Sequence, residues 1–415
     1  MKILILGGGG EVGRHIVVAA AKSDSFSQIT VGERDTERAY SVADDNNDKV
    51  RALPLDIVDD PALEAALADC DAVVSCVGPY YKFGTRVLSA AIRAGRHYID
   101  VCDDWEPTLD MLALDQQARA AGVSALTGMG ASPGVSNLLA AAARAALDRV
   151  AVLHTIWGVG DLDGAQAKEE DPSSHAALEH WLLQATGTIR VYQNGATTDV
   201  KPLQEHQVMF PGIGVVRCHS LGHPEPVTLP LTFPAIRESL NLMNMPEPIV
   251  EALRQTAHEL ETAELDMVQA VARLEKRLGE GESLAAAFGG LRFLYAVVSD
   301  SIKGVKYAPE ICALAVGEKD GRTARAGAWL DGYIPGGTSG STGLPVAAAL
   351  EMLANGEIDR RGVFAPEGGV NFERFFHRLE GYAVRPQASA GTPFLRVVVE
   401  ESLLQRSGRL TEEEV

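Results

Sequence analysis

Three glycines near the N-terminus have the spacing of a dinucleotide-binding loop. Gly8, Gly10 and Gly13 fit Gly-x-Gly-x-x-Gly, and they lie between an apolar run at 3–6 and a segment with helical periodicity at 13–21. In such a loop one glycine permits the tight turn, another lets the backbone approach a pyrophosphate, and the third lets the helix pack closely on the strand. The start of the helix would then turn its free N–H groups towards the phosphates.

An acidic residue follows where a ribose ligand is expected. Glu33 ends the stretch "ITVGE", twenty residues after Gly13. Its carboxylate would accept hydrogen bonds from both ribose hydroxyls and repel a 2′-phosphate, which favours NAD as the cofactor. Arg34 could pair with such a phosphate, so NADP stays open. Asp56, in "PLDI", could reach the adenine edge or cap the next helix.

Polar side chains also follow the later strand-like segments. In a doubly wound sheet, ligands bind beyond the carboxyl ends of the strands, so the end of "DAVVSCVGPYY" is expected to border the cofactor. Strand alternation lets only one of Tyr80 and Tyr81 face the cleft, and Tyr80 follows Gly-Pro directly. Asp100 and Asp103, in "YIDVCDD", reach the same edge, although each could cap the next helix instead. We therefore expect Tyr80, Asp100 and Asp103 to be catalytic.

The expected cofactor contacts all lie within the first eighty residues. They are Gly8, Gly10, Glu11, Val12, Gly13, Glu33, Arg34, Asp56, Ile57, Cys76, Val77, Gly78 and Pro79.

Alternation of strand-like and helix-like segments must position these residues. It continues to about residue 130 and predicts an α/β fold with a doubly wound parallel sheet of the Rossmann type. Hairpin chemistry follows, including Asp320–Gly321 at a turn, which predicts an α+β second domain. The expected division is 1–130 for the dinucleotide domain, 131–336 for a substrate and dimerisation domain, 337–395 for a C-terminal helical segment, and 396–415 for a tail.

Charge and cysteine usage narrow the class of protein. The net charge of -19 disfavours nucleic acid and anionic membranes as partners. The five cysteines are an odd number without a Cys-x-x-Cys pair, which favours a reducing compartment over a disulfide framework. The first apolar run is too short for a signal peptide and no stretch could span a bilayer, so we expect a cytoplasmic protein.

Two histidine-containing stretches contain residue types that are found in metal sites. In "HAALEH", His175 and His180 are five residues apart, so their rings diverge on a helix. "CHSLGHPE" has ligand residue types in Cys218, His219, His223 and Glu225 but lacks a second cluster. We expect no metal.

Four stretches together resemble the saccharopine dehydrogenase-like NAD(P)-dependent oxidoreductases. They are the N-terminal glycine loop, "CVGPYYKFGTRVLSAAIRAGRHYIDVCDD", "GASPGVSNLLA" and "STGLPVAAALEMLANGEIDRRGVFAPE". The resemblance implies a Rossmann domain, a second domain that binds substrate and forms a homodimer, and a C-terminal helix that returns to the first domain. It also implies hydride transfer at a C–N bond of an amino acid or amine, as in saccharopine reductases or lysine 6-dehydrogenases.

Such chemistry needs groups that hold the substrate as well as the cofactor. Arginine is suited to a substrate carboxylate because its fork binds both oxygens. The candidates are Arg237 and Arg292, together with Asn137 after the sixth strand. Two alternatives stay open: reductive condensation of an aldehyde with an amine, as in carboxyspermidine dehydrogenases, and a non-catalytic NAD(P)H sensor.

Overall fold

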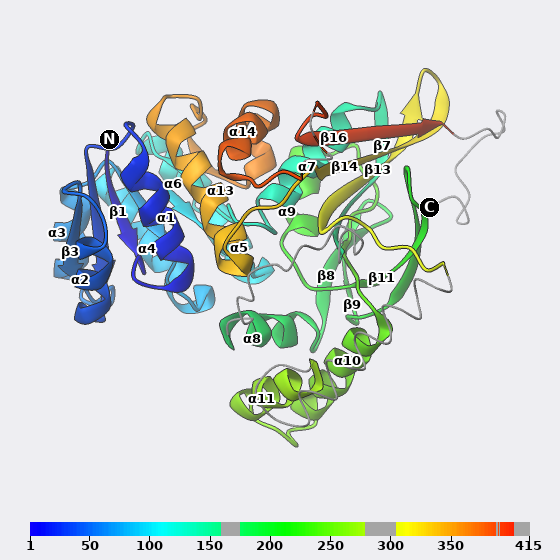
Figure 1. The fold of residues 1–415 in the computed structure, drawn as a ribbon, viewed down its shortest axis with the longest axis horizontal. Coiled ribbons are helices and arrows are strands. Elements are labelled where there is room, and N and C mark those ends of the chain that lie inside the picture. Colours follow the sequence, from blue (N-terminus) through cyan, green and yellow to red (C-terminus); the bar gives the residue numbers. More distant parts are fainter. Residues whose placement is uncertain (159–174, 279–303, 387–388, 390, 402–415) are drawn as a thin grey trace. The chain divides into compact units, whose positions relative to one another are not determined.

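The chain divides into two compact units, which are described separately (Figure 1). One unit consists of Met1–Leu138 and Asp331–Phe394, and the other of Leu139–Leu330 and Leu395–Val415. The computed structural model describes residues 1–158, 175–278, 304–386, 389 and 391–401. The segment 337–395, expected to be a C-terminal helical segment that returns to the Rossmann domain, lies almost entirely in the first unit.

The first unit is built on a parallel sheet with the order β15-β6-β5-β4-β1-β2-β3. Its strands are β1 Lys2–Leu6, β2 Gln28–Glu33, β3 Val50–Pro54, β4 Ala72–Ser75, β5 His97–Asp100, β6 Ser124–Leu126 and β15 Gly362–Phe364. The chain fills one side of β1 with β2 and β3, and then the other side with β4 to β6, so the order reverses between β1 and β4. The predicted doubly wound α/β fold is confirmed.

Helices connect these strands, and further helices come from the C-terminal stretch of the chain that belongs to this unit. They are α1 Glu11–Lys22, α2 Thr36–Asp44, α3 Asp60–Ala68, α4 Tyr80–Ala94, α5 Trp105–Leu112, α6 Asp115–Ala120, α13 Gly337–Ala354 and α14 Phe372–Leu379, while α7 Val135–Ala145 begins in this unit. Asp59 caps α3 by accepting a hydrogen bond from Ala62 N at 3.1 Å. Glycine permits the close approach of α13 to α1, since a Cβ at Gly343 would lie 2.7 Å from the Val12 carbonyl oxygen.

The helix after β4 begins earlier than expected. The sequence pattern predicted a helix from Thr85, whereas α4 starts at Tyr80 with Pro79 as its N-cap. The strand-alternation argument for Tyr80 and Tyr81 is therefore wrong, because both residues lie on the first turn of a helix. Tyr80 is buried and Tyr81 is 65% exposed.

The second unit contains a mixed sheet with the order β10-β11-β12-β7-β13-β14-β16. Its strands are β7 Arg149–Gly158, β10 Glu205–Phe210, β11 Gly214–Ser220, β12 Asn241–Asn244, β13 Ile311–Lys319, β14 Arg322–Leu330 and β16 Leu395–Glu401, beside a hairpin of β8 Ile189–Gln193 and β9 Ala196–Val200. Its helices are α8 His175–Gln184, α9 Glu225–Thr232, α10 Glu247–Glu261 and α11 Met267–Leu278. The hairpin expected at Asp320–Gly321 joins β13 to β14.

The stretch expected to be a tail begins instead with a strand. Residues Leu395–Glu401 pair with β14 in antiparallel register, with Val398 opposite Gly327. Three consecutive valines have a high preference for a strand, and this outweighs the polar composition that follows them. Among the described helices, none combines the length and the apolar character needed to cross a membrane.

Candidate functional site

The glycine loop between β1 and α1 has the shape that a dinucleotide requires. A Cβ at Gly13 would come within 2.6 Å of Gly8 Cα, so only glycine lets α1 pack this closely on the end of β1. A Cβ at Gly10 would meet only the Gly7 carbonyl oxygen, at 3.2 Å, which leaves the approach to the loop open. Gly10 is also the N-cap of α1 and no side chain caps the helix there. The loop therefore fits a bound pyrophosphate.

Glu33 borders this loop from the end of β2. Its Oε1 accepts a hydrogen bond from Arg34 N at 3.0 Å, and a Cβ at Gly9 would lie 3.3 Å from Oε2. The carboxylate thus lies beside the glycines, as a ribose ligand would, while Arg34 is exposed. Asp56 is exposed as well, and it accepts from Val58 N at 3.1 Å rather than capping α3.

The end of β4 lies against the same loop. A Cβ at Gly7 would lie 3.0 Å from the Cys76 carbonyl oxygen and 3.3 Å from Val77 Cγ2. Burial raises the pKa of the Cys76 thiol to about 12, so it stays protonated at neutral pH. Gly78 and Pro79 follow and lead into α4. The structure therefore places the cofactor contacts expected after β4 next to the glycine loop that follows β1.

Asp100 is a fully buried carboxylate at the carboxyl end of β5. Its Oδ1 accepts hydrogen bonds from Gly128 N at 2.7 Å, Cys102 N at 3.0 Å and Thr127 Oγ1 at 3.1 Å. Burial raises the pKa of Asp100 to about 6, and these hydrogen bonds oppose the shift. Asp100 does not cap the next helix, because its bonds join the loop after β5 to the loop after β6.

Two further hydroxyls lie near Asp100 that the sequence analysis did not select. Ser75 faces Asp100 across the β4–β5 register. Tyr98 lies on the same side of β5, two residues earlier, and its hydroxyl is near enough to influence the pKa of Asp100. Within the described part of the chain, Asp100 Oδ2, Ser75 Oγ and Tyr98 OH have no partner aligned for a hydrogen bond. Alternation along "HYID" was the signal that could have identified Tyr98.

Tyr80 is placed beside this group but is held within the protein core. Its hydroxyl donates to the Ser75 carbonyl oxygen at 2.9 Å and accepts from Val101 N at 3.4 Å. Burial and the Asp100 carboxylate raise the pKa of Tyr80 well above its usual value. These contacts join the ends of β4 and β5, which is a positioning role, and a catalytic role for Tyr80 stays a prediction. Asp103 is half-buried in the loop before α5.

The expected substrate ligands lie in separate places. Asn137 is buried in the first unit, where its Nδ2 donates to Glu367 Oε2 at 2.8 Å and its Oδ1 accepts from Gly134 N at 2.9 Å. Arg237, in the second unit, is exposed and donates to the Asn194 carbonyl oxygen at 2.9 Å beside the β8–β9 turn. Arg292 lies outside the described residues.

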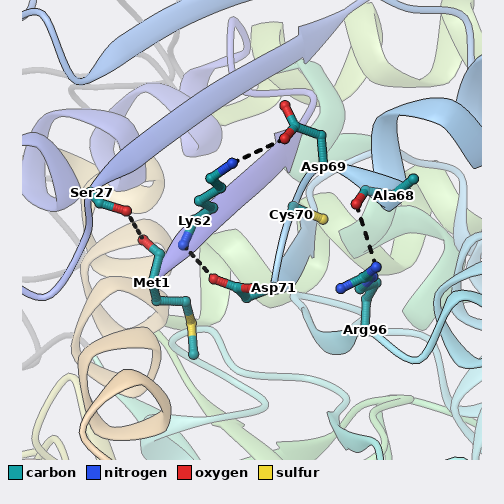
Figure 2. A pocket seen from close by; sticks show the side chains of 8 residues that line it. All are labelled: Met1, Lys2, Ser27, Ala68, Asp69, Cys70, Asp71 and Arg96. Atoms are coloured by element: carbon teal, nitrogen blue, oxygen red, sulfur yellow. Dashed lines mark hydrogen bonds and ion pairs between the residues drawn. The ribbon is translucent and has the colours of Figure 1, made fainter.

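A surface hollow lies at the opposite ends of the strands of the first unit (Figure 2). It is lined by Met1, Lys2, Ser27, Ala68, Asp69, Cys70, Asp71 and Arg96. These residues precede the strands or begin them, whereas ligands of open α/β sheets bind beyond the carboxyl ends. Lys2 Nζ pairs with Asp69 at 3.1 Å and Lys2 N donates to Asp71 at 2.8 Å, so the polar groups here are paired with one another.

Comparisons with known proteins identify a nucleotide-binding domain within the first unit. Residues 3–126 match the model of the saccharopine dehydrogenase NADP binding domain. Carboxyaminopropylagmatine dehydrogenase of Synechocystis sp. is 24% identical over 392 residues, covering 88% of this chain and 92% of that protein. Saccharopine dehydrogenase [NADP(+), L-glutamate-forming] of Pyricularia oryzae is 22% identical over 413 residues, covering 83% and 89%.

A solved structure shares the fold along almost the whole chain. The apo saccharopine dehydrogenase (L-Glu forming) from Saccharomyces cerevisiae covers 96% of this chain and 99% of its own, with a TM-score of 0.59 and 16% identity. The matched domain model supports a nicotinamide cofactor, and its description specifies NADP.

Proposed function

We propose that this chain, a saccharopine dehydrogenase-like protein, is an NAD(P)-dependent oxidoreductase that transfers a hydride at a C–N bond of an amino acid or amine. The observation that carries the proposal is Asp100, a fully buried carboxylate at the carboxyl end of β5. It lies in a Rossmann sheet whose glycine loop fits a dinucleotide. Similarity to two kinds of dehydrogenase extends over more than four fifths of the chain.

The residues divide the work between cofactor and substrate. The bound nicotinamide supplies the hydride acceptor or donor. The glycine loop and the start of α1 hold its pyrophosphate, and Glu33 holds the ribose. Asp100 has a pKa of about 6, so its carboxylate can hold or release a proton near neutral pH. We assign that proton to Oδ2, because Oδ1 already accepts hydrogen bonds.

A turnover screen tests the proposal. Amino acids, diamines and saccharopine are offered with each nicotinamide cofactor, and cofactor absorbance is followed in both directions. Turnover with at least one amine supports the oxidoreductase. Cofactor binding without turnover across the panel would instead identify a sensor. Product analysis separates oxidation of an amine from reductive condensation of an aldehyde with an amine. The panel includes agmatine because the Synechocystis relative is a carboxyaminopropylagmatine dehydrogenase.

We further propose NAD as the preferred cofactor, although the matched domain model is described as NADP binding. Glu33 supports this, since its carboxylate is held beside the glycine loop by a backbone N–H donor. A phosphate at the ribose 2′ position would meet a like charge there. The unmodified protein should bind NADH more tightly than NADPH, and Glu33→Gln should narrow the difference about tenfold or more, since ~1.4 kcal/mol corresponds to a factor of ten.

Fluorescence titration with both reduced cofactors measures this preference. Glu37→Gln is a matched control, because Glu37 is an exposed carboxylate on the first turn of α2. Tighter binding of NADPH by the unmodified protein would transfer the selecting role to Arg34. Homodimerisation, cytoplasmic location and a role in amino-acid metabolism belong to the same proposal, and sedimentation of the purified protein tests the first of them.

A further inference from the structure

Three buried polar side chains lie together where β4 and β5 end in the first unit. Ser75, Tyr98 and Asp100, here called the strand-end cluster, are each at most 1% exposed. Ser75 lies opposite Asp100 in the parallel register, and Tyr98 precedes Asp100 by two residues, so all three side chains point to one face of the sheet. Helix α4 covers this face, because its residue Tyr80 belongs to the same core cluster as Tyr98.

Each member of the strand-end cluster has a polar atom without an aligned hydrogen-bond partner in the described part of the chain. These atoms are Ser75 Oγ, Tyr98 OH and Asp100 Oδ2. A buried polar atom without a hydrogen bond costs free energy, and a buried charge costs more. The three atoms therefore matter most when Asp100 is ionised.

The titratable groups that face Asp100 do not supply a positive charge. Burial and the Asp100 carboxylate raise the pKa values of four side chains on the end of β4, on α4, on β5 and in the loop after β5, which are Cys76, Tyr80, Tyr98 and Cys102. None of these four is a cation, and Asp103, which acts on Cys102, is negative as well. Ionisation of Asp100 therefore depends on neutral hydrogen-bond donors.

Two hydroxyl hydrogens are available on the open side of Asp100. Its Oδ1 already accepts three hydrogen bonds, whereas Oδ2 has no aligned donor. A carboxylate only accepts, while a hydroxyl brings one hydrogen that it can turn by rotation. Burial raises the pKa of Asp100, and the Tyr98 hydroxyl, as a donor, lowers it in part. Burial also raises the pKa of Tyr98, and the Ser75 hydroxyl lowers it in part. Tyr98 thus connects Ser75 to Asp100.

We propose that Tyr98 is a positioning residue that stabilises the ionised form of Asp100 through Oδ2, and that Ser75 orients Tyr98. The Tyr98 hydroxyl turns its hydrogen towards Oδ2 when Asp100 is ionised, and it offers its oxygen when Oδ2 carries the proton. Tyr98 is fully buried, so it acts through Asp100. The inference rests on the proposed function, in which Asp100 is the acid–base group, and it specifies how the ionisation of that group is regulated.

Tyr98→Phe tests the inference because it keeps the ring and removes the hydroxyl. A hydrogen bond to a charged group is lost, so the pH midpoint that Asp100 contributes to turnover should move up by about 1–2 units from about 6. This midpoint is the one that Asp100→Asn abolishes. Profiles of kcat/KM against pH measure it, with an amine that the turnover screen finds active. A role in packing alone would lower the melting temperature and leave the midpoint in place.

Stability provides a second readout that requires no turnover. The pKa of Asp100 is raised in the folded protein, so protonated Asp100 adds stability below its ordinary value of 3.8, and this contribution is lost as the pH rises through about 6. The free energy of unfolding is compared between each protein and its Asp100→Asn counterpart. In Tyr98→Phe, this difference should continue to change to a pH about 1–2 units higher than in the unmodified protein.

Two further variants provide the comparison. Tyr382→Phe is the matched control, because Tyr382 belongs to the same unit and its hydroxyl donates to Glu351 Oε1 at 3.2 Å. It should leave the Asp100 midpoint unchanged. Ser75→Ala should raise the midpoint by less than Tyr98→Phe does, because Ser75 acts through Tyr98. When it is combined with Tyr98→Phe, it should shift the midpoint no further.

The stability profile decides between the possible outcomes. The inference is overturned if the profile of Tyr98→Phe coincides with that of the unmodified protein, if Tyr382→Phe shifts it equally, or if the shift from Ser75→Ala persists in full on top of Tyr98→Phe. If circular dichroism shows that Tyr98→Phe is unfolded, Ser75→Ala decides in its place, and the absence of a shift there overturns the inference. A shifted profile in a protein without turnover contradicts only the oxidoreductase, whereas turnover with an unshifted profile contradicts only the role of Tyr98.

Discussion

Asp100→Asn should lower turnover by about 10²–10³ while leaving cofactor affinity nearly unchanged. The amide oxygen can keep the bonds from Gly128 N and Cys102 N, so the loops after β5 and β6 stay joined. The substitution removes the charge and the proton-accepting oxygen. Preorganised polar groups of this kind typically contribute about 2–4 kcal/mol to lowering a barrier. Steady-state kinetics and cofactor titration on the same preparation measure the two quantities.

The same variant has a second expected signature in stability. The pKa of Asp100 is about 6, above the ordinary value of 3.8, so ionisation opposes folding. The contribution of the protonated Asp100 to stability is fully present below pH 4 and is lost as the pH rises through 6. At 1.36 kcal/mol per pKa unit, this contribution amounts to about 3 kcal/mol. The unmodified protein should therefore lose about this much free energy of unfolding relative to Asp100→Asn between pH 4 and 7.

Chemical denaturation at several pH values tests this difference. Asp110→Asn, at an exposed position of α5, should follow the unmodified protein in both turnover and pH dependence. Normal turnover in Asp100→Asn, with only the stability profile changed, would leave Asp100 as a residue that joins two loops and remove it from the site.

Gly10→Val should abolish detectable cofactor binding while the first unit stays folded. The valine side chain would occupy the open approach to the loop, where the pyrophosphate needs the backbone. Its Cβ meets only the Gly7 carbonyl oxygen, at 3.2 Å, so the backbone can accommodate it with a small shift. We expect a loss of affinity of at least 100-fold by calorimetry, with a melting temperature within a few degrees of the unmodified protein.

Two other glycines provide the comparison. Gly381→Val lies far along the chain, where a Cβ would meet nothing within 4 Å, and should leave both quantities unchanged. Gly13→Val should destabilise the first unit itself, because its Cβ would collide with the backbone of Gly7 and Gly8. If Gly10→Val binds the cofactor with unchanged affinity, the loop does not hold the pyrophosphate.

The parts of the fold that depend on local sequence could be predicted. Alternating segments predicted the strands β1 to β6 of a doubly wound parallel sheet, and the Asp-Gly turn identified the β13–β14 hairpin. The start of α4 was misplaced because the segment after Gly-Pro continues directly as a helix, and apolar alternation does not reveal where a strand ends. Asp100 was found by its place at a strand end, although the reason for its raised pKa, complete burial, depends on tertiary packing.

The resemblance implied that the C-terminal segment returns to the first unit, but the individual contacts between distant segments could not be predicted. Asn137 binds Glu367 across 230 residues, and β15 extends the sheet beside β6 only because the chain returns to the first unit. The sequence supplied the residue types, but only the tertiary structure shows which polar atoms remain without partners.

The interrupted first unit also determines when the protein can mature on the ribosome. The nascent chain makes β6 long before β15, and at ~5–20 residues per second the segment between them takes roughly 10–50 s to translate. Throughout that interval β6 presents an open strand edge and α1 lacks α13, so the growing polypeptide exposes surface that invites aggregation. A polypeptide that ends before residue 364 would keep this strand edge open, and an open edge is a template for pairing with another chain.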